Sequence, residues 1–167
     1  MEDMIIRPAQ TGDADTLARI QTASWRDGFR GILDPAVLAA HTDLSRVTAM
    51  YRRVLQNPAI RVNMGLVAET PHCLAAWSVN RDGLAEDIAE LICIHSLSRR
   101  WRQGYGSAMM AHVLAEMGAA GFREAVLWVF EENRRARAFY EALGFSAEAA
   151  LRNDLGAREI RYRKRLS

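Results

Sequence analysis

Residues 89–117 constrain the fold more than any other stretch, because a buried strand, a polar turn and a helix follow one another there. The apolar run at 91–94 is bounded by polar residues, which predicts a strand over residues 89–95. A polar turn follows at residues 96–103. After Gly104, apolar side chains recur at spacings of three and four, which predicts a helix with one buried face.

Two glycines at the start of this helix leave its first turn open. Gly104 and Gly106 lack the side chains that would keep a ligand away from the backbone. A helix N-terminus offers N–H groups without intrahelical partners and the positive end of the helix dipole. Arg99, Arg100 and Arg102 add positive charge nearby. These features together predict an anion-binding cradle, although glycines that only ease a tight turn are the plainer interpretation.

The composition is that of an ordinary globular protein. At 167 residues, the chain is expected to form a single domain over 1–167 with a substantial core. Hydrophobic residues make up 50% and charged residues 25%, which excludes a disordered chain. The net charge of +2 is too small to favour a nucleic-acid partner.

The cysteines and the hydropathy pattern indicate the compartment. The two cysteines, Cys73 and Cys93, lie in apolar stretches without metal-ligand spacing, so we expect free buried thiols and no metal site. No segment is long and apolar enough to span a membrane, and the first ten residues lack the apolar core of a signal peptide. We therefore expect a cytoplasmic protein with no membrane partner.

The remaining pattern predicts a mixed sheet with helices. Strands are expected at residues 4–7, 61–69, 73–79, 124–130, 146–151 and 157–163, with Pro71 separating the second from the third. Helices are expected from Thr11 or Asp13 to residue 25, at 35–40 after Asp34, at 43–55, and at 134–143 after Asn133. Residues 25–33 are expected to form a packed loop. This order predicts an α/β or α+β fold with one mixed sheet.

Two segments then resemble the GNAT superfamily of acyl-CoA-dependent N-acetyltransferases. Residues 90–110 resemble its signature strand, turn and Arg/Gln-x-x-Gly-x-Gly/Ala pyrophosphate loop. Residues 127–145 resemble its strand, Asn, helix with Phe-Tyr, and Leu-Gly-Phe, in the same order and spacing. The resemblance covers nearly the whole chain and implies a mostly antiparallel sheet of about seven strands flanked by helices.

This chain departs from the family pattern at one position. Aligning Gly104 and Gly106 with the two family glycines puts Trp101 where Arg or Gln is usual, and Arg102 where Gly is common. The backbone cradle remains, but one usual side-chain anchor is missing.

The resemblance implies that acetyl-CoA is the co-substrate. In the family, the pantetheine arm lies in a gap between the fourth and fifth strands, where it pairs with exposed backbone. Carried over, the backbone of His95, Ser96 and Leu97 would bind this arm. The pyrophosphate and the rest of the cofactor would contact Arg102, Gln103, Gly104, Tyr105, Gly106, Ser107 and Asn133, of which Asn133 is equally suited to cap a helix.

The implied reaction is acetyl transfer to a primary amine by direct attack in a ternary complex. The amine must lose a proton, and the CoA thiolate must be protonated or stabilised as it leaves. Tyr140 falls at the general-acid position of the family, although an aromatic packed beside Phe139 is the plainer interpretation.

Two residues are candidates for the general base, and the sequence does not choose between them. Glu90 lies on the central strand and can take a proton through water, or it can simply pair with an arginine. His95 has a suitable intrinsic pKa, but a histidine at a strand end is commonly a packing residue. Simple alternation puts them on opposite faces of the strand, and a bulge would change that phase.

The acceptor is less constrained. Trp25, Arg26 and Phe29 lie where the family lines its acceptor site, and ordinary packing is the favoured interpretation of these residues.

A dinucleotide-binding enzyme fits poorly, because Met109 takes the place of the third small residue. A non-catalytic acyl-CoA-binding or protein-interaction module on the same fold is the alternative function. A homodimer through the C-terminal strands stays open.

Overall fold

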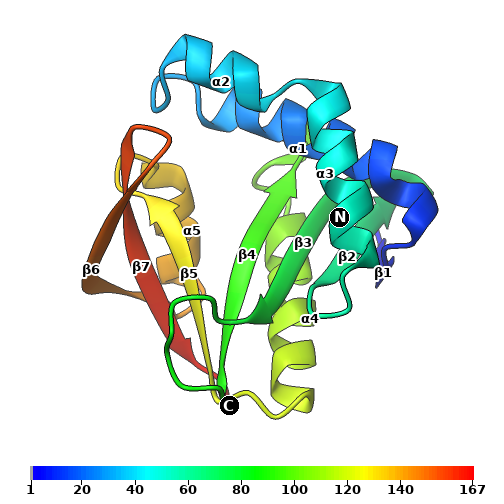
Figure 1. The fold of residues 1–167 in the computed structure, drawn as a ribbon. Coiled ribbons are helices and arrows are strands. Elements are labelled where there is room, and N and C mark those ends of the chain that lie inside the picture. The colour runs from blue at the N-terminus through cyan, green and yellow to red at the C-terminus, as the bar shows by residue number, and fades with distance from the viewer. Residues whose placement is uncertain (1) are drawn as a thin grey trace.

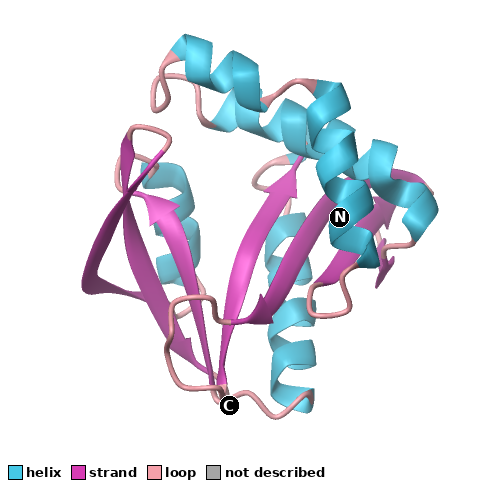
Figure 2. Cartoon of the chain, in the orientation of Figure 1, coloured by secondary structure: helices cyan, strands magenta, loops and turns pink. Residues whose placement is uncertain are grey.

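A mixed sheet of seven strands, in the order β1-β2-β3-β4-β5-β7-β6, packs against five helices in this computed structural model, which describes residues 2–167 (Figures 1 and 2). The strands are β1 (Met4–Pro8), β2 (Arg61–Val67), β3 (Thr70–Val79), β4 (Ile88–Ser96), β5 (Glu124–Phe130), β6 (Ser146–Asp154) and β7 (Ala157–Arg165). The helices are α1 (Ala14–Gly28), α2 (Pro35–His41), α3 (Leu44–Gln56), α4 (Tyr105–Ala119) and α5 (Arg134–Ala142), with 3₁₀ turns η1 (Thr11–Asp13) and η2 (Ser98–Arg100). Within residues 2–167, none of these helices combines the length and apolarity needed to cross a bilayer. The predicted fold class is confirmed.

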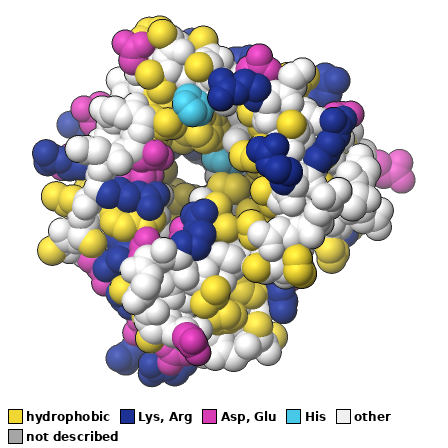
Figure 3. Space-filling view, viewed as in Figure 1, with side chains coloured by type: hydrophobic (Ala, Val, Ile, Leu, Met, Phe, Trp, Pro, Cys, Tyr) yellow, Lys and Arg dark blue, Asp and Glu magenta, His cyan; other side chains and the backbone are white. Residues whose placement is uncertain are grey.

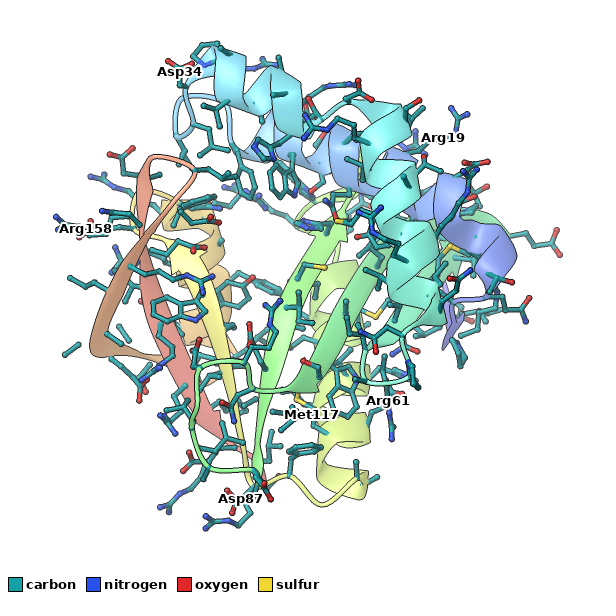
Figure 4. The ribbon with its side chains drawn as sticks, in the orientation of Figure 1. Arg19, Asp34, Arg61, Asp87, Met117 and Arg158 are labelled. Carbon is teal, nitrogen blue, oxygen red and sulfur yellow. The ribbon has the colours of Figure 1, made fainter. Side chains whose placement is uncertain are left out.

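The sheet opens between its two central strands. All the other neighbouring strands are antiparallel, whereas β4 and β5 are parallel and pair only through Ile88, Ala89 and Glu90. Past Glu90 the two strands diverge, so that β1–β4 and β5–β7 form the two sides of a V (Figure 1). Asp87 lies at the closed end of this gap, where it pairs with Arg123 (Figure 4). The β4 edge facing β5 is therefore left without a strand partner beyond Glu90.

Two apolar cores hold the helices on opposite faces of the sheet. One contains four fully buried side chains of α4: Met109, Met110, Val113 and Met117. The other contains Leu17 of α1 with Val47 and Tyr51 of α3. Burying each such side chain contributes about 1.5–3 kcal/mol. Because both faces of β2 are covered, that strand is buried at most positions rather than half-buried as its alternation predicted.

The turn between β2 and β3 differs from the prediction. Pro71 does not separate these strands but lies inside β3, opposite Leu66, next to an irregularity in the register. Proline has no backbone N–H to donate to the neighbouring strand, and this loss is tolerated where the strand pairing is irregular. The chain reverses instead at Ala68 and Glu69, whose φ angles are +48° and +65°, as a two-residue hairpin turn requires.

Local capping was predicted with mixed success. The carboxylate of Asp34 and the side-chain oxygen of Asn133 accept backbone N–H groups at the starts of α2 and α5, and these two caps are confirmed. Asp43 caps α3 in the same way, where the sequence placed it inside the helix. Asp13 makes no such cap to α1, because its carboxylate is bound by Arg7 and by the Gln10 N–H. The expected loop at residues 25–33 is wrong at its start, since α1 continues to residue 28.

Both cysteines are free thiols, as predicted. Cys73 is fully buried in the core under α4, and Cys93 is half-buried on β4. Burial raises the pKa of Cys73 to about 12 and that of Cys93 to about 11, so both are protonated near neutral pH.

Candidate active site

A bulge in β4 brings two predicted site residues to the same side. Ala76 of β3 pairs with Cys93, whereas the next residue, Trp77, pairs with Leu91, so Ile92 has no partner opposite it. The extra residue shifts the alternation of side chains by one position. Glu90 and His95 therefore lie on the same face of the sheet instead of opposite faces, and both line the cavity described below.

The same register determines which backbone groups of β4 face the gap. The Leu97 N–H donates to the His72 carbonyl on the β3 side. Along an antiparallel strand, residues alternate between those that exchange bonds with the neighbouring strand and those whose N–H and C=O point away from it. The polar backbone groups of Ile94 and Ser96 consequently point into the gap between β4 and β5.

The gap holds a cavity of about 930 Å³. Its walls come from β4 and β5, from the ends of α1, α4 and α5, and from the β6–β7 hairpin. In the space-filling view it is the deep hollow at the centre of the molecule, with hydrophobic, basic, acidic and histidine side chains around its rim (Figure 3). The cavity has two chemically different ends, one at the start of α4 and one beside Glu90 and β6.

The first end is built from backbone N–H groups and arginines. Gly104 caps α4 in the left-handed conformation, with φ of +90°. Among the described residues, no group accepts from the N–H of Tyr105, Gly106 or Ser107, so these donors are free for an anion. A Cβ on Gly106 would come within 3.4 Å of the Phe139 ring. A Cβ at position 106 would therefore touch this ring, and a larger side chain there would have to displace it.

The predicted cofactor residues gather at this end, with three exceptions. Lining the cavity are His95, Ser96, Arg102, Gly104, Gly106, Ser107 and Asn133. Gln103 and Tyr105 are not among the lining residues, and the Tyr105 ring is buried against His72. Leu97 is also absent from the lining, and its N–H donates to the His72 carbonyl while its carbonyl accepts from the Arg100 N–H. The Leu97 N–H is therefore not free to donate to a ligand.

Tyr140 lies where the two ends meet. Its ring packs against Phe139, Phe145 and Tyr162, which accounts for the packing role that the sequence also allowed. Its side chain lines the cavity, and its hydroxyl makes no hydrogen bond to a described residue. Burial raises the pKa of Tyr140 well above its ordinary value, and the nearby Cys93 adds to this. The phenol therefore keeps its proton at neutral pH.

Glu90 is one of the most buried charged side chains, at 2% exposure. The Arg81 guanidinium donates to both of its carboxylate oxygens, at 3.1 Å and 2.6 Å, and the Arg81 N–H donates at 3.0 Å. A carboxylate has about four lone-pair directions, so one remains free beside these three bonds. Glu90 is both ion-paired and able to accept a further hydrogen bond.

His95 is engaged differently. The indole Nε1 of Trp25 donates to its Nε2 at 3.2 Å, so that nitrogen has no free lone pair. Burial lowers the pKa of His95 to about 4, which keeps the ring neutral at physiological pH. The Trp25 ring also contacts His41 of α2 and Phe29, which fixes α1 and α2 above the cavity.

Residues 25–29 do more than pack. Trp25 and Phe29 pack against each other, as the favoured interpretation expects, and both also line the cavity. Arg26 does not line it, and its guanidinium donates to the Thr42 carbonyl. The sequence signal was the aromatic pair at spacing four, which puts both rings on the same side of a helix.

The wall opposite β4 was not predicted. Asp82 accepts from the Trp128 indole at 2.9 Å and from Arg161, while Arg152 pairs with Glu159 at 2.8 Å. Burial raises the pKa of Glu159 despite this pair. These residues come from a loop and three strands, and no motif in the sequence links them.

Comparisons with known proteins are consistent with this geometry. Residues 35–145 match the model of the acetyltransferase (GNAT) family. Among solved structures, an N-acetyltransferase from Thermoplasma acidophilum in complex with coenzyme A has a TM-score of 0.79 at 18% identity, covering 98% of this chain and 99% of that one. An acetyltransferase from Thermus thermophilus has a TM-score of 0.74 at 20% identity, covering 99% and 100%. No curated protein matches the sequence. At these identities the solved structures support the fold.

Proposed function

Because the chain belongs to the acetyltransferase (GNAT) family, we propose that it transfers an acetyl group from acetyl-CoA to a primary amine. The amine attacks while both substrates are bound, without an acetylated form of the protein. One observation carries this proposal. The unpaired edge of β4 runs along a cavity that reaches from the free N–H groups of α4 to Tyr140.

The residues at the first end fit coenzyme A. Its diphosphate suits the free N–H groups of Tyr105, Gly106 and Ser107 at the positive end of the helix dipole. Its pantetheine arm is an extended chain with two amides, which can pair with an unpaired strand edge as an added strand does. The gap-facing groups of Ile94 and Ser96 supply that edge. When bound, the cofactor supplies an acetyl group activated as a thioester.

Tyr140 is proposed as the general acid. The acceptor nitrogen forms a bond to the acetyl carbon while the carbon–sulfur bond breaks, and the departing sulfur then needs a proton. Tyr140 retains its proton at neutral pH, and its hydroxyl has no partner among the described residues. A positioned acid of this kind contributes about 10²–10⁴-fold to rate.

Glu90 is proposed to take the proton of the amine through water. It lines the cavity and keeps one free lone-pair direction. His95 is the weaker candidate, because Trp25 occupies its Nε2. We assign His95 and Trp25 to the wall of the acceptor pocket.

Calorimetric titration with acetyl-CoA tests the proposal. We expect micromolar binding by the wild type, about −8 kcal/mol. Gly104→Glu should abolish it, because a carboxylate would occupy the anion site. Gly121→Glu is the matched control, since Gly121 also has positive φ, +96°, but lies beyond the other end of α4 with open space around it.

A second measurement separates the enzyme from the alternative function. Release of the CoA thiol is followed with a panel of primary amines. Binding with acetyl transfer to any of them supports the proposal. Binding without transfer across a broad panel favours an acyl-CoA-binding module, and no binding by the folded wild type favours a protein-interaction module.

A further inference from the structure

The Trp101 side chain is hydrogen-bonded to a backbone carbonyl of β4 that faces the gap. Its indole Nε1 donates to the Ser96 carbonyl at 2.9 Å. The Leu97 N–H is bound on the opposite, β3 side, so the Ser96 carbonyl belongs to the edge that β5 leaves unpaired. Trp101 thus donates to the Ser96 carbonyl, the same acceptor that an extended ligand in the gap would use.

The same indole links the two sides of the gap. The guanidinium of Arg135, at the start of α5, lies 3.6 Å above the Trp101 ring. Trp101 follows β4, whereas Arg135 follows β5, so their stacking crosses the opening between the strands. Among the described residues, no carboxylate pairs with Arg135. Its charge remains available to an anion.

The end of α1 leaves this bridge little spare room. A Cβ on Gly28 would lie 3.3 Å from Nη2 of Arg135 and 3.9 Å from the Trp101 ring. The preceding residue, Asp27, accepts a hydrogen bond from the Ser98 hydroxyl at 2.6 Å, which ties α1 to the turn before Trp101. The indole is therefore bound by the Ser96 carbonyl and by Arg135, and the end of α1 lies beside it.

We propose that Trp101 is a gate on the cofactor gap, an inference that rests on the proposed function. In the closed state its N–H holds the Ser96 carbonyl and its ring holds Arg135. When acetyl-CoA binds, an amide N–H of its pantetheine arm replaces the indole N–H as the donor to the Ser96 carbonyl. The Arg135 side chain then turns from the indole ring towards the phosphates. The ligand gains a hydrogen bond to Ser96 only at the cost of the bond that Trp101 makes there. The closed state therefore lowers the affinity for acetyl-CoA without abolishing binding.

Trp101→Phe tests the gate, because phenylalanine retains a ring for Arg135 and removes the N–H donor. We expect acetyl-CoA to bind about 3- to 10-fold more tightly and to associate faster, since one internal hydrogen bond no longer competes. The measurements are calorimetry for affinity and stopped-flow kinetics for association. Equal or weaker binding by the variant, with the wild type still binding, would overturn the gate and leave the proposed function standing.

A spectroscopic measurement on the wild type does not depend on the variant folding. The four tryptophans give four indole N–H signals in a proton–nitrogen correlation spectrum. The Trp101 signal, assigned on the wild type by correlating each indole with its own backbone amide, should move on addition of acetyl-CoA. The signal of Trp77, buried in the core, serves as the reference. A Trp101 signal unchanged at saturation overturns the gate, and absence of binding by both proteins overturns the proposed function together with it.

Discussion

The two ends of the cavity are built from different parts of the chain. The end at α4 consists mainly of backbone: free N–H groups after Gly104 and the gap-facing groups of β4. The end beside Glu90 consists of side chains from α1, the β3–β4 loop, β5 and the β6–β7 hairpin, tied together by ion pairs. The first end needs only glycines and a helix start, whereas the second depends on which side chains meet.

This difference explains what each end can recognise. Backbone donors at a helix N-terminus suit any phosphate, so an end of that kind fits one common cofactor. Paired side chains such as Arg81–Glu90 and Arg152–Glu159 present a shape and charge pattern that changes with each substitution. Substitutions at Tyr140, His72 and Glu90 test how far the two ends differ.

Tyr140→Phe tests the point where the two ends meet. We expect kcat to fall about 1000-fold, because the sulfur of CoA loses its proton donor. Cofactor affinity should stay within about 2-fold, because the Tyr140 hydroxyl is not part of the end that we assign to cofactor binding. Initial rates with an accepted amine, together with calorimetry, measure both. An unchanged kcat would show that the cavity works without this phenol.

His72→Leu tests how the cofactor end is supported from beneath. His72 is buried against Tyr105, and neither of its ring nitrogens is hydrogen-bonded to any of residues 2–167. Burial, aided by Arg100 and Arg99, lowers the pKa of His72 from 6.5 to about 4. Because the folded state resists protonation of His72, its contribution is fully present above pH 6.5 and is lost as the pH falls towards 4. The loss amounts to about 3 kcal/mol.

Removing the imidazole should therefore flatten the pH dependence of the unfolding free energy between pH 6.5 and 4.5. Urea unfolding of the wild type and His72→Leu at several pH values measures this. His95, whose pKa is lowered in the same way, remains in both proteins and sets the residual slope. Identical slopes for the two proteins would mean that His72 is not the group responsible.

Glu90→Gln tests the acceptor end. We expect kcat/KM for the amine to fall about 10- to 100-fold, with unchanged cofactor affinity, because glutamine does not take the proton. Arg81→Met is the control, since it removes the same ion pair and keeps the carboxylate. A smaller loss in Arg81→Met than in Glu90→Gln supports a role in proton transfer. Equal losses of kcat/KM in the two variants would show that Glu90 acts only as the ion-pair partner of Arg81.

Much of the architecture was readable from local patterns. The strand at residues 124–130, the helix after Gly104 and the Asn133 cap occur where the sequence predicted them, because each depends on residues a few positions apart. The predictions were wrong where contacts between distant segments overrode a local sequence signal. Pro71 is accommodated inside β3 by the register shift, and the end of α1 stays helical where a loop was expected.

The family and the order of the elements could be predicted from the sequence alone, because glycines, caps and apolar spacing act over short distances. The tertiary structure decided the rest of the candidate site. The register between β3 and β4 puts the bulge at Ile92, and this one residue brings Glu90 and His95 to the same face of the sheet. The contacts of Trp25 with His95, and of Trp101 with Ser96 and Arg135, likewise arise only when separate segments pack together. Such pairings are long-range, because each is set by the geometry of the whole sheet and not by neighbours along the chain.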